Sequence, residues 1–260
     1  MVEVTTTPPG KDLLLLEWRA LAELWGLAAV WPHLALITPR GDGHPVLVLP
    51  GLISDDKSTL SLRKFLKLKG YITYGWDMGV NRGPLPGMQD RLVERVEGLA
   101  EQHGQKISII GWSLGGIYAR QLGKLKPDLV RQVISLGSPF GGSPRATNAW
   151  RLYELASGQD SDHAASQDHL GGDLAATPSV RTTAIYSKHD GVCAWQNCIE
   201  ENASNTENIE VYSSHCGLGH HPAVAYAIAD RLAQPENDWT PFSPFEVFRF
   251  AFPLPSYRTA

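Results

Sequence analysis

The feature that most constrains this chain is the alternation of short apolar runs with helical patterns between residues 44 and 235. The short runs are typical of strands buried on both faces, whereas the longer stretches repeat apolar residues near a 3.6-residue spacing. Strands that alternate with helices predict βαβ crossovers and a mainly parallel sheet. We therefore expect an α/β fold with a mainly parallel central sheet and helices on both faces. The expected strands occupy residues 44–51, 71–76, 106–110, 130–136, 182–186 and 209–213, and the expected helices occupy 58–69, 88–103, 114–124 and 223–232.

One stretch interrupts this alternation. Residues 142–180 hold a helical pattern at 148–156 and a polar run, but no clear strand. Compact domains rarely carry unstructured connections longer than about 15 residues, and those that exist are often lids or binding loops. We therefore expect a helical cap inserted into the core. The expected division is an N-terminal helical extension packed on the core (1–43), an α/β core (44–141 and 181–235), the cap (142–180) and a C-terminal tail (236–260).

Composition excludes several classes of protein. The chain has 260 residues, of which 43% are hydrophobic and 19% charged, so it can bury a large core, which a disordered chain cannot do. Its formal net charge of −4 gives no excess of Lys and Arg, which binding to nucleic acid or anionic lipid requires. We expect one soluble domain with no nucleic-acid partner.

No segment is expected to cross a membrane or to act as a secretion signal. A membrane span needs about 20 consecutive apolar residues, and the best candidate, 13–37, is interrupted by Glu17, Arg19 and Glu23. The first residues lack the basic start and the apolar run of a signal peptide. This pattern favours the cytoplasm, whereas a disulfide would favour a secreted or periplasmic protein.

One string carries a chemical signal. Residues 106–116 read KISIIGWSLGG, a strand that runs into a G-x-S-x-G and then a helix. In so tight a turn the central residue is held above the sheet in a strained conformation, and its neighbours must be small. Gly111 and Gly115 meet that requirement. The pattern also occurs by chance in loops, but the flanking strand and helix favour a nucleophile elbow at Ser113, where free helix N–H groups favour developing negative charge.

Five segments together resemble the α/β-hydrolase superfamily, and within it the bacterial serine lipases and esterases. They are residues 46–52 (VLVLPGL), 111–115 (GWSLG), 137–141 (GSPFG), the loop around Asp190 and 214–219 (SHCGLG). The resemblance covers about residues 44–235. It implies an eight-strand-type fold, a serine nucleophile and a cap between the sixth and seventh strands.

The resemblance also implies the chain order Ser, acid, His, with each residue on a loop at the carboxyl end of a strand. A serine hydroxyl is a weak nucleophile, so it needs a general base and a third group that orients the base. Asp190 follows the strand at 182–186 and is the expected acid, with a turn-capping role as the alternative. His215 is the first histidine after the strand at 209–213 and is the expected base.

Other side chains compete for these two roles. Asp162, Asp168 and Asp173 precede the strand at 182–186 and lie inside the expected cap. His220 and His221 lie where the last helix begins, and His189 is expected to belong to the turn beside Asp190.

An attacked carbonyl becomes an oxyanion that two backbone N–H groups usually hold. In this fold one donor is the residue after the nucleophile, Leu114, and the other follows the first strand, where Leu52 is the expected donor. The alternative is that Gly51 and Leu52 form only a tight turn.

Three cysteines leave at least one thiol unpaired within the chain. A disulfide between Cys198 and Cys216 would tie the Asp190 loop to the His215 loop. The alternatives are a bridge between Cys193 and Cys198, and three buried free thiols in a reducing compartment.

The acidic and histidine residues of the expected cap match no defined metal spacing, so we expect a solvated loop and no metal. These residues are Asp162, His163, Asp168, His169 and Asp173. Aromatic residues near both ends are expected to pack on the domain, with the rim of an acyl pocket or an interface as the alternative. They are Trp18, Trp25, Trp31, Phe245, Phe248, Phe250 and Phe252.

These residues predict a cofactor-independent serine esterase or lipase that acts on a small-molecule or lipid ester through an acyl-enzyme. An acyltransferase or a polyester depolymerase would use the same triad, with or without contact at a lipid interface. A hydrolase-like binding protein without activity is the alternative from another class, and it would require a triad position unable to act.

Overall fold

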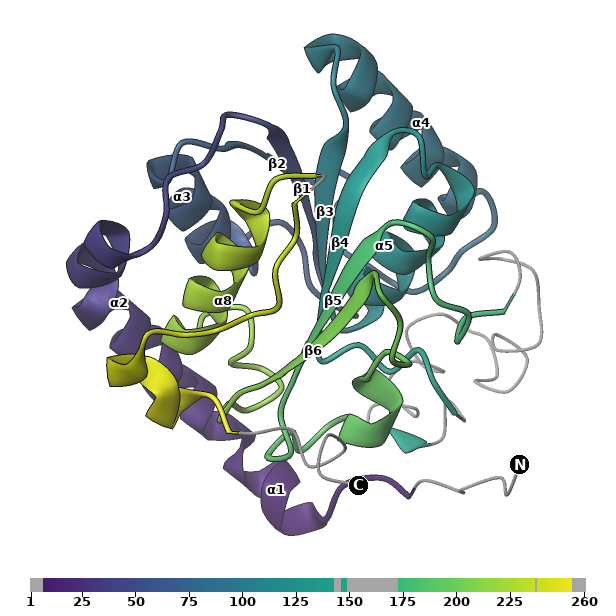
Figure 1. Cartoon of the computed structure of the whole chain (residues 1–260). Helices are drawn as coiled ribbons and strands as arrows, with labels where there is room; N and C mark the ends of the chain where they lie inside the picture. The colour runs from purple at the N-terminus through teal and green to yellow at the C-terminus, as the bar shows by residue number, and fades with distance from the viewer. Residues whose placement is uncertain (1–6, 143–145, 149–172, 237, 254–260) are drawn as a thin grey trace.

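A six-stranded parallel sheet forms the centre of the molecule, with strands in the order β2-β1-β3-β4-β5-β6 (Figure 1). The structure is a computed structural model that describes residues 7–142, 146–148, 173–236 and 238–253. The predicted α/β fold is confirmed. The resemblance implied eight strands, whereas the described residues contain six. The strands are β1 (Pro45–Leu49), β2 (Ile72–Gly75), β3 (Ile107–Trp112), β4 (Val130–Leu136), β5 (Arg181–Tyr186) and β6 (Thr206–Glu210).

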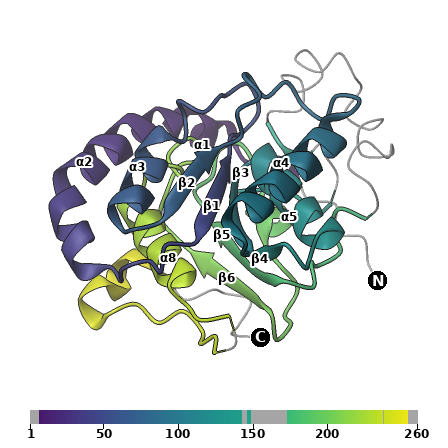
Figure 2. The same ribbon diagram turned by 90° about the horizontal axis from the view of Figure 1, so that it is seen from above.

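Helices cover both faces of this sheet (Figures 1 and 2). On one face lie α4 (Met88–His103) and α5 (Leu114–Leu125), and on the other lie α2 (Ala20–Ile37), α3 (Leu60–Leu68) and α8 (Pro222–Leu232). The shorter elements are α1 (Lys11–Leu15) and the 3₁₀-helices η1 (Leu16–Arg19), η4 (Trp195–Cys198) and η5 (Glu246–Ala251).

Strand β1 shows why both helical layers are needed. Successive side chains of a strand point to opposite faces. Val46 and Val48 pack in the core that includes α3 and α8, whereas Leu47 and Leu49 pack in the core that includes α4 and α5. All five residues of the strand are buried, so its continuous apolar run is explained by a sheet covered on both sides.

The last strand differs from the sequence expectation. Strand β6 was expected at 209–213 but spans Thr206–Glu210, three residues earlier. Its partner β5 ends at Tyr186, which pairs with Glu210, so the ladder has no further residue to pair. The N–H of Val211 still donates to the carbonyl oxygen of Tyr186 at 2.9 Å, and from there to His215 the chain is a loop outside the sheet.

Most of the expected cap, including nearly all of the helix predicted at 148–156, lies outside the described residues. Its described end, 173–180, approaches α5. There Lys124 donates to the carbonyl oxygen of Asp173 at 2.6 Å, and Arg120 donates to the carbonyl oxygens of Ala175 and Ala176, each at 3.1 Å.

The N-terminal helical segment runs beside α8 and α3 (Figure 1). Leu27 and Leu34 are buried in the core, and the ring of Trp31 meets that of Phe65 edge-on at 5.6 Å between centroids. By length and composition alone, Lys11–Ile37 is long and apolar enough to cross a bilayer, and only 11% of its most apolar window is buried.

The expected packing of the terminal aromatic residues is confirmed only in part. Trp31 and Phe248 pack against the core, and Phe252 is buried. The others are exposed, because they lie on the outer side of their helical segments. The exposed residues are Trp18, Trp25, Phe245 and Phe250.

A buried ion pair joins α5 to the chain after η4. The guanidinium of Arg120 contacts the carboxylate of Glu200, and both side chains are almost fully buried. Burial lowers the pKa of Arg120 to about 9. The same guanidinium lies over the ring of Phe140, 3.5 Å from its centroid. The guanidinium of Arg120 therefore joins α5 to the chain after η4, to the loop that carries Phe140, and to the backbone of residues 175–176.

We expect Glu200→Ala to lower the free energy of unfolding by about 3–5 kcal/mol, because it leaves the charge of Arg120 buried without its carboxylate. The matched control is Glu97→Ala, which removes an ion pair with Lys126 at 2.6 Å between side chains that are 46% and 34% exposed. That change is expected to cost less than about 1 kcal/mol. Urea unfolding followed by tryptophan fluorescence measures both, and equal small losses would contradict the role of the buried pair.

Candidate active site

The turn from β3 to α5 places Ser113 in a conformation that side chains rarely adopt. Its φ is 53° and its ψ is −121°, and such strain is characteristic of the nucleophile elbow. A Cβ on Gly111 would lie 2.1 Å from the carbonyl oxygen of Gly115, and one on Gly115 would lie 2.5 Å from that of Leu49. Both predicted elbow glycines are therefore required by backbone that passes too close for any side chain.

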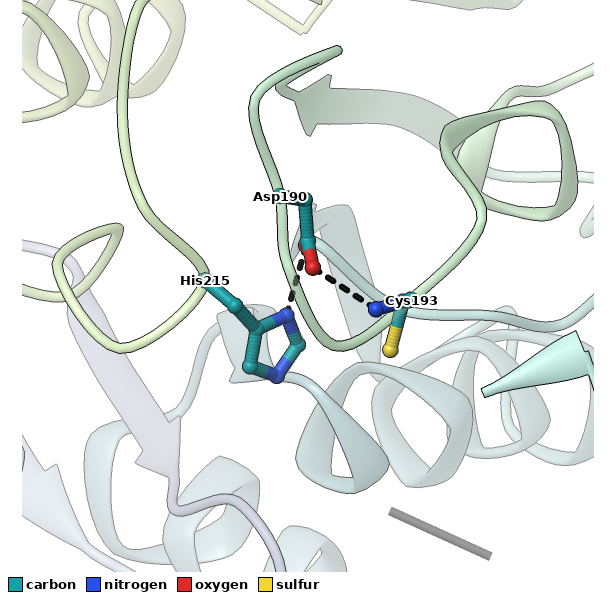
Figure 3. Close-up of side chains that lie close together, drawn as sticks. All are labelled: Asp190, Cys193 and His215. Atoms are coloured by element: carbon teal, nitrogen blue, oxygen red, sulfur yellow. Dashed lines mark hydrogen bonds and ion pairs between the residues drawn. The ribbon is translucent and has the colours of Figure 1, made fainter. Parts of the chain in front are cut away.

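The three side chains predicted from the motif order meet in the structure. His215 Nε2 lies 3.0 Å from Ser113 Oγ, and His215 Nδ1 lies 2.6 Å from Asp190 Oδ2. Figure 3 shows His215 and Asp190 facing each other from two separate loops. We call these the Asp190 loop (187–194), which follows β5, and the His215 loop (211–221), which follows β6.

The contacts of Asp190 determine the tautomer of His215. An ionised carboxylate only accepts hydrogen bonds, so Nδ1 carries the proton and Nε2 accepts from the Ser113 hydroxyl. The other carboxylate oxygen of Asp190 accepts from the N–H groups of Val192 at 2.8 Å and Cys193 at 2.7 Å. Asp190 is 3% exposed and His215 is 6% exposed. The carboxylate is thus fixed at both oxygens and aimed at the imidazole.

Burial and charge act in opposite directions on His215. Burial, the largest single influence, would lower the pKa of the imidazole, but the charge and hydrogen bond of Asp190, together with those of Cys193, outweigh it and raise the pKa well above its ordinary value. The site therefore stabilises the imidazolium that would form if Nε2 took a proton from Ser113.

Contacts from other elements hold the His215 loop beyond the end of β6. Trp112, the variable residue of the elbow motif, donates from Nε1 to the carbonyl oxygen of His215 at 3.1 Å. The hydroxyl of Ser187 accepts from the N–H of Ser213 at 3.2 Å and from that of His189 at 3.0 Å. These bonds link the elbow, the Asp190 loop and the His215 loop.

The two predicted oxyanion donors lie beside Ser113. Leu114 is the first residue of α5, and a Cβ on Gly51 would lie 3.3 Å from Ser113 Cβ, so the loop that carries Leu52 touches the serine. Within the described part of the chain, neither the N–H of Leu52 nor that of Leu114 donates to an acceptor. Both N–H groups are therefore free of other acceptors there, as donors to an oxyanion must be.

The rival residues lie elsewhere or serve local structure. His221 caps α8 by accepting from the N–H of Ala223 at 3.2 Å, as its place at the helix start predicted. The ring of His220 meets Trp112 edge-on, and the N–H of His189 bonds Ser187 within the turn. Asp173 accepts from the N–H of Ala175. Asp162 and Asp168, with the neighbouring His163 and His169, lie outside the described residues.

The predicted disulfide between Cys198 and Cys216 is wrong, because all three cysteines are free. The side chain of Cys198 packs with Cys193 and Tyr186 in a small core, whereas Cys216 is exposed. A hydrogen bond with Cys198, together with burial, raises the pKa of Cys193 well above its ordinary value. The alternative of three buried free thiols is right for Cys193 and Cys198, which are in contact, but wrong for the burial of Cys216.

One group of side chains has the residue types of a metal site. The ligand atoms of Asp190, Cys193 and His215 lie within 4.8 Å of one another (Figure 3). Asp190 already holds His215 through a 2.6 Å hydrogen bond, and the raised pKa keeps the Cys193 thiol protonated, whereas metals bind the thiolate. The arrangement is therefore suited to proton transfer rather than to holding a cation.

Sequence reasoning missed two features of this site. A Cβ on Gly137, whose φ is +53°, would lie 3.2 Å from both Asp190 Oδ2 and His215 Nδ1, so this glycine leaves room for the pair. Its place directly after a strand, in the string GSPFG, was the available signal. Glu17 and Glu23 also contact the two loops, and two acids in an otherwise apolar helix were the signal for them.

We expect Asp190→Asn to lower the pKa of His215, because the attraction that raises it is removed while the burial that lowers it remains. NMR titration of the His215 imidazole measures the change. Asp128→Asn, on an exposed turn far from the imidazole, is the control and should leave the pKa in place. An unchanged His215 pKa in Asp190→Asn would contradict the assigned cause.

We expect Gly115→Ala to destabilise the fold by at least about 1–3 kcal/mol, because the new methyl group would meet the backbone oxygens of Leu49 and Pro50 at 2.5 and 2.7 Å. Gly98→Ala is the matched control. A Cβ there meets nothing within 4 Å, so the exchange inside α4 should stabilise by roughly 0.5–1 kcal/mol. Urea unfolding measures both signs, and a neutral Gly115→Ala would exclude the tight approach.

Solved structures share this architecture. The chain superposes on lipase B of Aspergillus fumigatus with a TM-score of 0.56 at 17% identity, over 74% of this chain and 53% of that one, so it spans about half the length of that lipase. A pyrethroid hydrolase, PytH, matches with a TM-score of 0.56 at 15% identity, over 74% and 98% of the two chains. A monoacylglycerol lipase of Paleococcus ferrophilus matches with a TM-score of 0.50 at 13% identity, over 74% of this chain and 96% of that one.

No protein-family model and no curated protein sequence matches the chain. The sheet order, the strained turn at Ser113 and these superpositions together identify the chain as a protein of the α/β-hydrolase fold.

Proposed function

We propose that this protein is a carboxylic ester hydrolase that works through a Ser113–His215–Asp190 triad. The observation that carries the proposal is the continuous hydrogen-bonded chain from Ser113 Oγ to His215 Nε2, at 3.0 Å, and from His215 Nδ1 to Asp190 Oδ2, at 2.6 Å. This chain begins at a serine held in a strained turn at the start of a helix. Those are the parts that nucleophilic acyl transfer requires.

In the first half of the reaction, Ser113 Oγ attacks the carbonyl carbon of the ester while His215 Nε2 takes its proton. Asp190 stabilises the imidazolium and keeps it oriented. The N–H groups of Leu52 and Leu114 hold the oxyanion, and such stabilisation is typically worth about 3–4 kcal/mol for each donor. His215 then donates the proton to the leaving alcohol, and the acyl group stays on Ser113.

In the second half, water enters and His215 takes one of its protons as the oxygen attacks the acyl-enzyme. Collapse of the second tetrahedral intermediate releases the carboxylic acid and returns the proton to Ser113. The side chains and amides named here supply nucleophile, base and electrostatic stabilisation, so the proposed reaction uses no cofactor. The proposed substrate is a small-molecule or lipid ester.

Two further observations support this proposal. Two of the similar solved structures are named lipases and the third a hydrolase. The three free thiols fit a reducing compartment, so we propose a soluble cytoplasmic enzyme.

We expect a fluorophosphonate probe to label Ser113 and p-nitrophenyl esters to be hydrolysed by the wild-type protein. Ser113→Ala should lose the label and reduce kcat by at least about 10³-fold, because the nucleophile is removed. Intact-mass and peptide mapping locate the label, and release of p-nitrophenol gives the rate.

Ser204→Ala is the matched control, because Ser204 is an exposed serine in a turn. It should retain both labelling and turnover. Full activity in Ser113→Ala would refute the serine mechanism, and a wild-type protein that neither labels nor turns over any ester would show a binding scaffold instead.

A further inference from the structure

Three charged side chains of the N-terminal helical segment, Glu17, Arg19 and Glu23, turn toward the Asp190 and His215 loops, although the segment is largely apolar. Leu15, Trp18, Leu21 and Trp25 are exposed by 65–76%, whereas Glu17 and its neighbours Arg19 and Glu23 contact the Asp190 and His215 loops. The leucines and tryptophans of this segment therefore face solvent, while Glu17, Arg19 and Glu23 face the loops of the proposed catalytic centre.

The short 3₁₀-helix η1 aligns the two acids. Three residues complete one turn of a 3₁₀-helix, against 3.6 in an α-helix. With one 3₁₀ turn from Glu17 to Ala20 and α-helix from there to Glu23, the two acids are separated by about 60° around the axis, against about 120° in a continuous α-helix. Both carboxylates thus lie on nearly the same face of the segment, the face toward the two loops.

A single carboxylate bridges these loops. Glu17 Oε1 accepts from the N–H of Gly191 at 2.8 Å and from the N–H of His215 at 3.0 Å, and Glu17 Oε2 accepts from the N–H of Cys216 at 2.8 Å. Gly191 follows Asp190 directly in the chain. One side chain therefore binds the backbone of the proposed base itself and the backbone beside the proposed acid.

The ionisation of Glu17 suits this role. Burial alone would raise the pKa of the carboxyl group, but the three backbone hydrogen bonds outweigh it and the pKa lies below its ordinary value. Hydrogen bonds to a charged acceptor are about twice as strong as those between neutral groups. Glu17 therefore holds both loops as a carboxylate at neutral pH.

Glu23 and Arg19 extend the same contact. Glu23 accepts from the N–H of Ser214 at 2.8 Å and from its hydroxyl at 2.7 Å. Arg19 forms an ion pair with Glu23 at 3.7 Å and donates to the carbonyl oxygens of His189 and Ser213. The helix therefore contacts each loop at more than one point.

The helix and these loops pack so closely that neither Gly191 nor Gly217 has space for a side chain. A Cβ on Gly191 would lie 2.4 Å from the carbonyl oxygen of Leu13, and one on Gly217 would overlap the carboxylate of Glu23. Because the chain beyond Glu210 lies outside the sheet ladder, the His215 loop depends on such contacts for its position.

We propose that Glu17 is a positioning residue, which holds the Asp190 and His215 loops at the separation that the Ser113–His215–Asp190 relay needs. The inference rests on the proposed function. It assigns the N-terminal segment Lys11–Ile37 a part in ester hydrolysis in addition to its packing on α8.

The test is Glu17→Gln in the full chain, with hydrolysis of a p-nitrophenyl ester as the assay. The amide oxygen can still accept from the N–H groups of Gly191 and His215, but the NH₂ group then meets the N–H donor of Cys216, so at least one of the three hydrogen bonds becomes a repulsive contact. We expect kcat to fall roughly 10- to 100-fold, because small displacements of reacting groups cost rates of that order, while KM changes by less than about twofold. The low-field NMR signal of the His215 Nδ1 proton should broaden or vanish in the folded variant.

Asp12→Asn is the matched control, since Asp12 is an exposed acid on the same segment. It should keep the wild-type kcat and the His215 signal. Thermal unfolding of each variant gives the folded fraction at the assay temperature, and Glu17→Ala, which removes all three bonds, should lower kcat at least as far as Glu17→Gln.

Three results would overturn the inference while the wild type still hydrolyses the ester and labels at Ser113. They are a kcat in Glu17→Gln equal to that of Asp12→Asn, a loss that matches the unfolded fraction, and a change confined to KM. A wild-type protein that neither labels nor hydrolyses would instead refute the proposed function, so the two failures are distinguishable.

Discussion

The close approach of three backbone segments at one end of the sheet is the constraint on which this molecule depends. The end of β1, the end of β3 and the first turn of α5 meet at distances that leave no space for a Cβ on Gly111 or Gly115. This packing forces Ser113 into its positive φ and directs its hydroxyl away from the sheet. This contact forms only because β1 and β3 are neighbours in the parallel ladder. The helices bury the apolar side chains on both faces of that ladder.

Around this rigid centre, loops supply the other functional groups. His215 and Asp190 come from segments that follow β6 and β5, and each carries hydrogen bonds beyond the one that joins them. The proposed triad requires groups whose own positions are held by their neighbours. Trp112, Ser187 and Glu17 provide that support from three different elements.

The parts of the structure that could be predicted are those encoded locally. Short apolar runs and 3.6-residue patterns located all six described strands and four core helices, with α4 and β4 predicted to the residue. The elbow motif carries its own explanation, because the spacing of Gly111, Ser113 and Gly115 specifies the turn. Asp190 and His215 were found because the fold orders them along the chain.

Other features depend on contacts between distant residues, and local patterns do not report them. Strand β6 was placed three residues late because its end is set by the end of its partner β5. The Cys198–Cys216 bridge failed because the direction of the Cys198 side chain is decided by its packing against Tyr186. Glu17 contributes through bonds to residues 174 to 199 positions away, which no spacing within the helix reveals.

That sequence separation has a consequence for how the chain reaches its folded state during synthesis. The helix that carries Glu17 and Glu23 is made before the backbone groups that bind these two acids, which lie 174 to 199 residues after Glu17 and 191 after Glu23. At a typical synthesis rate of about 5–20 residues per second, Glu17 and Glu23 wait roughly 10–40 s for these backbone partners. The apolar side chains on the other side of the helix are exposed during that time. A nascent chain of this design therefore exposes the apolar side of this helix until residues 191–216 have been made, and transiently exposed apolar surface of this kind favours aggregation.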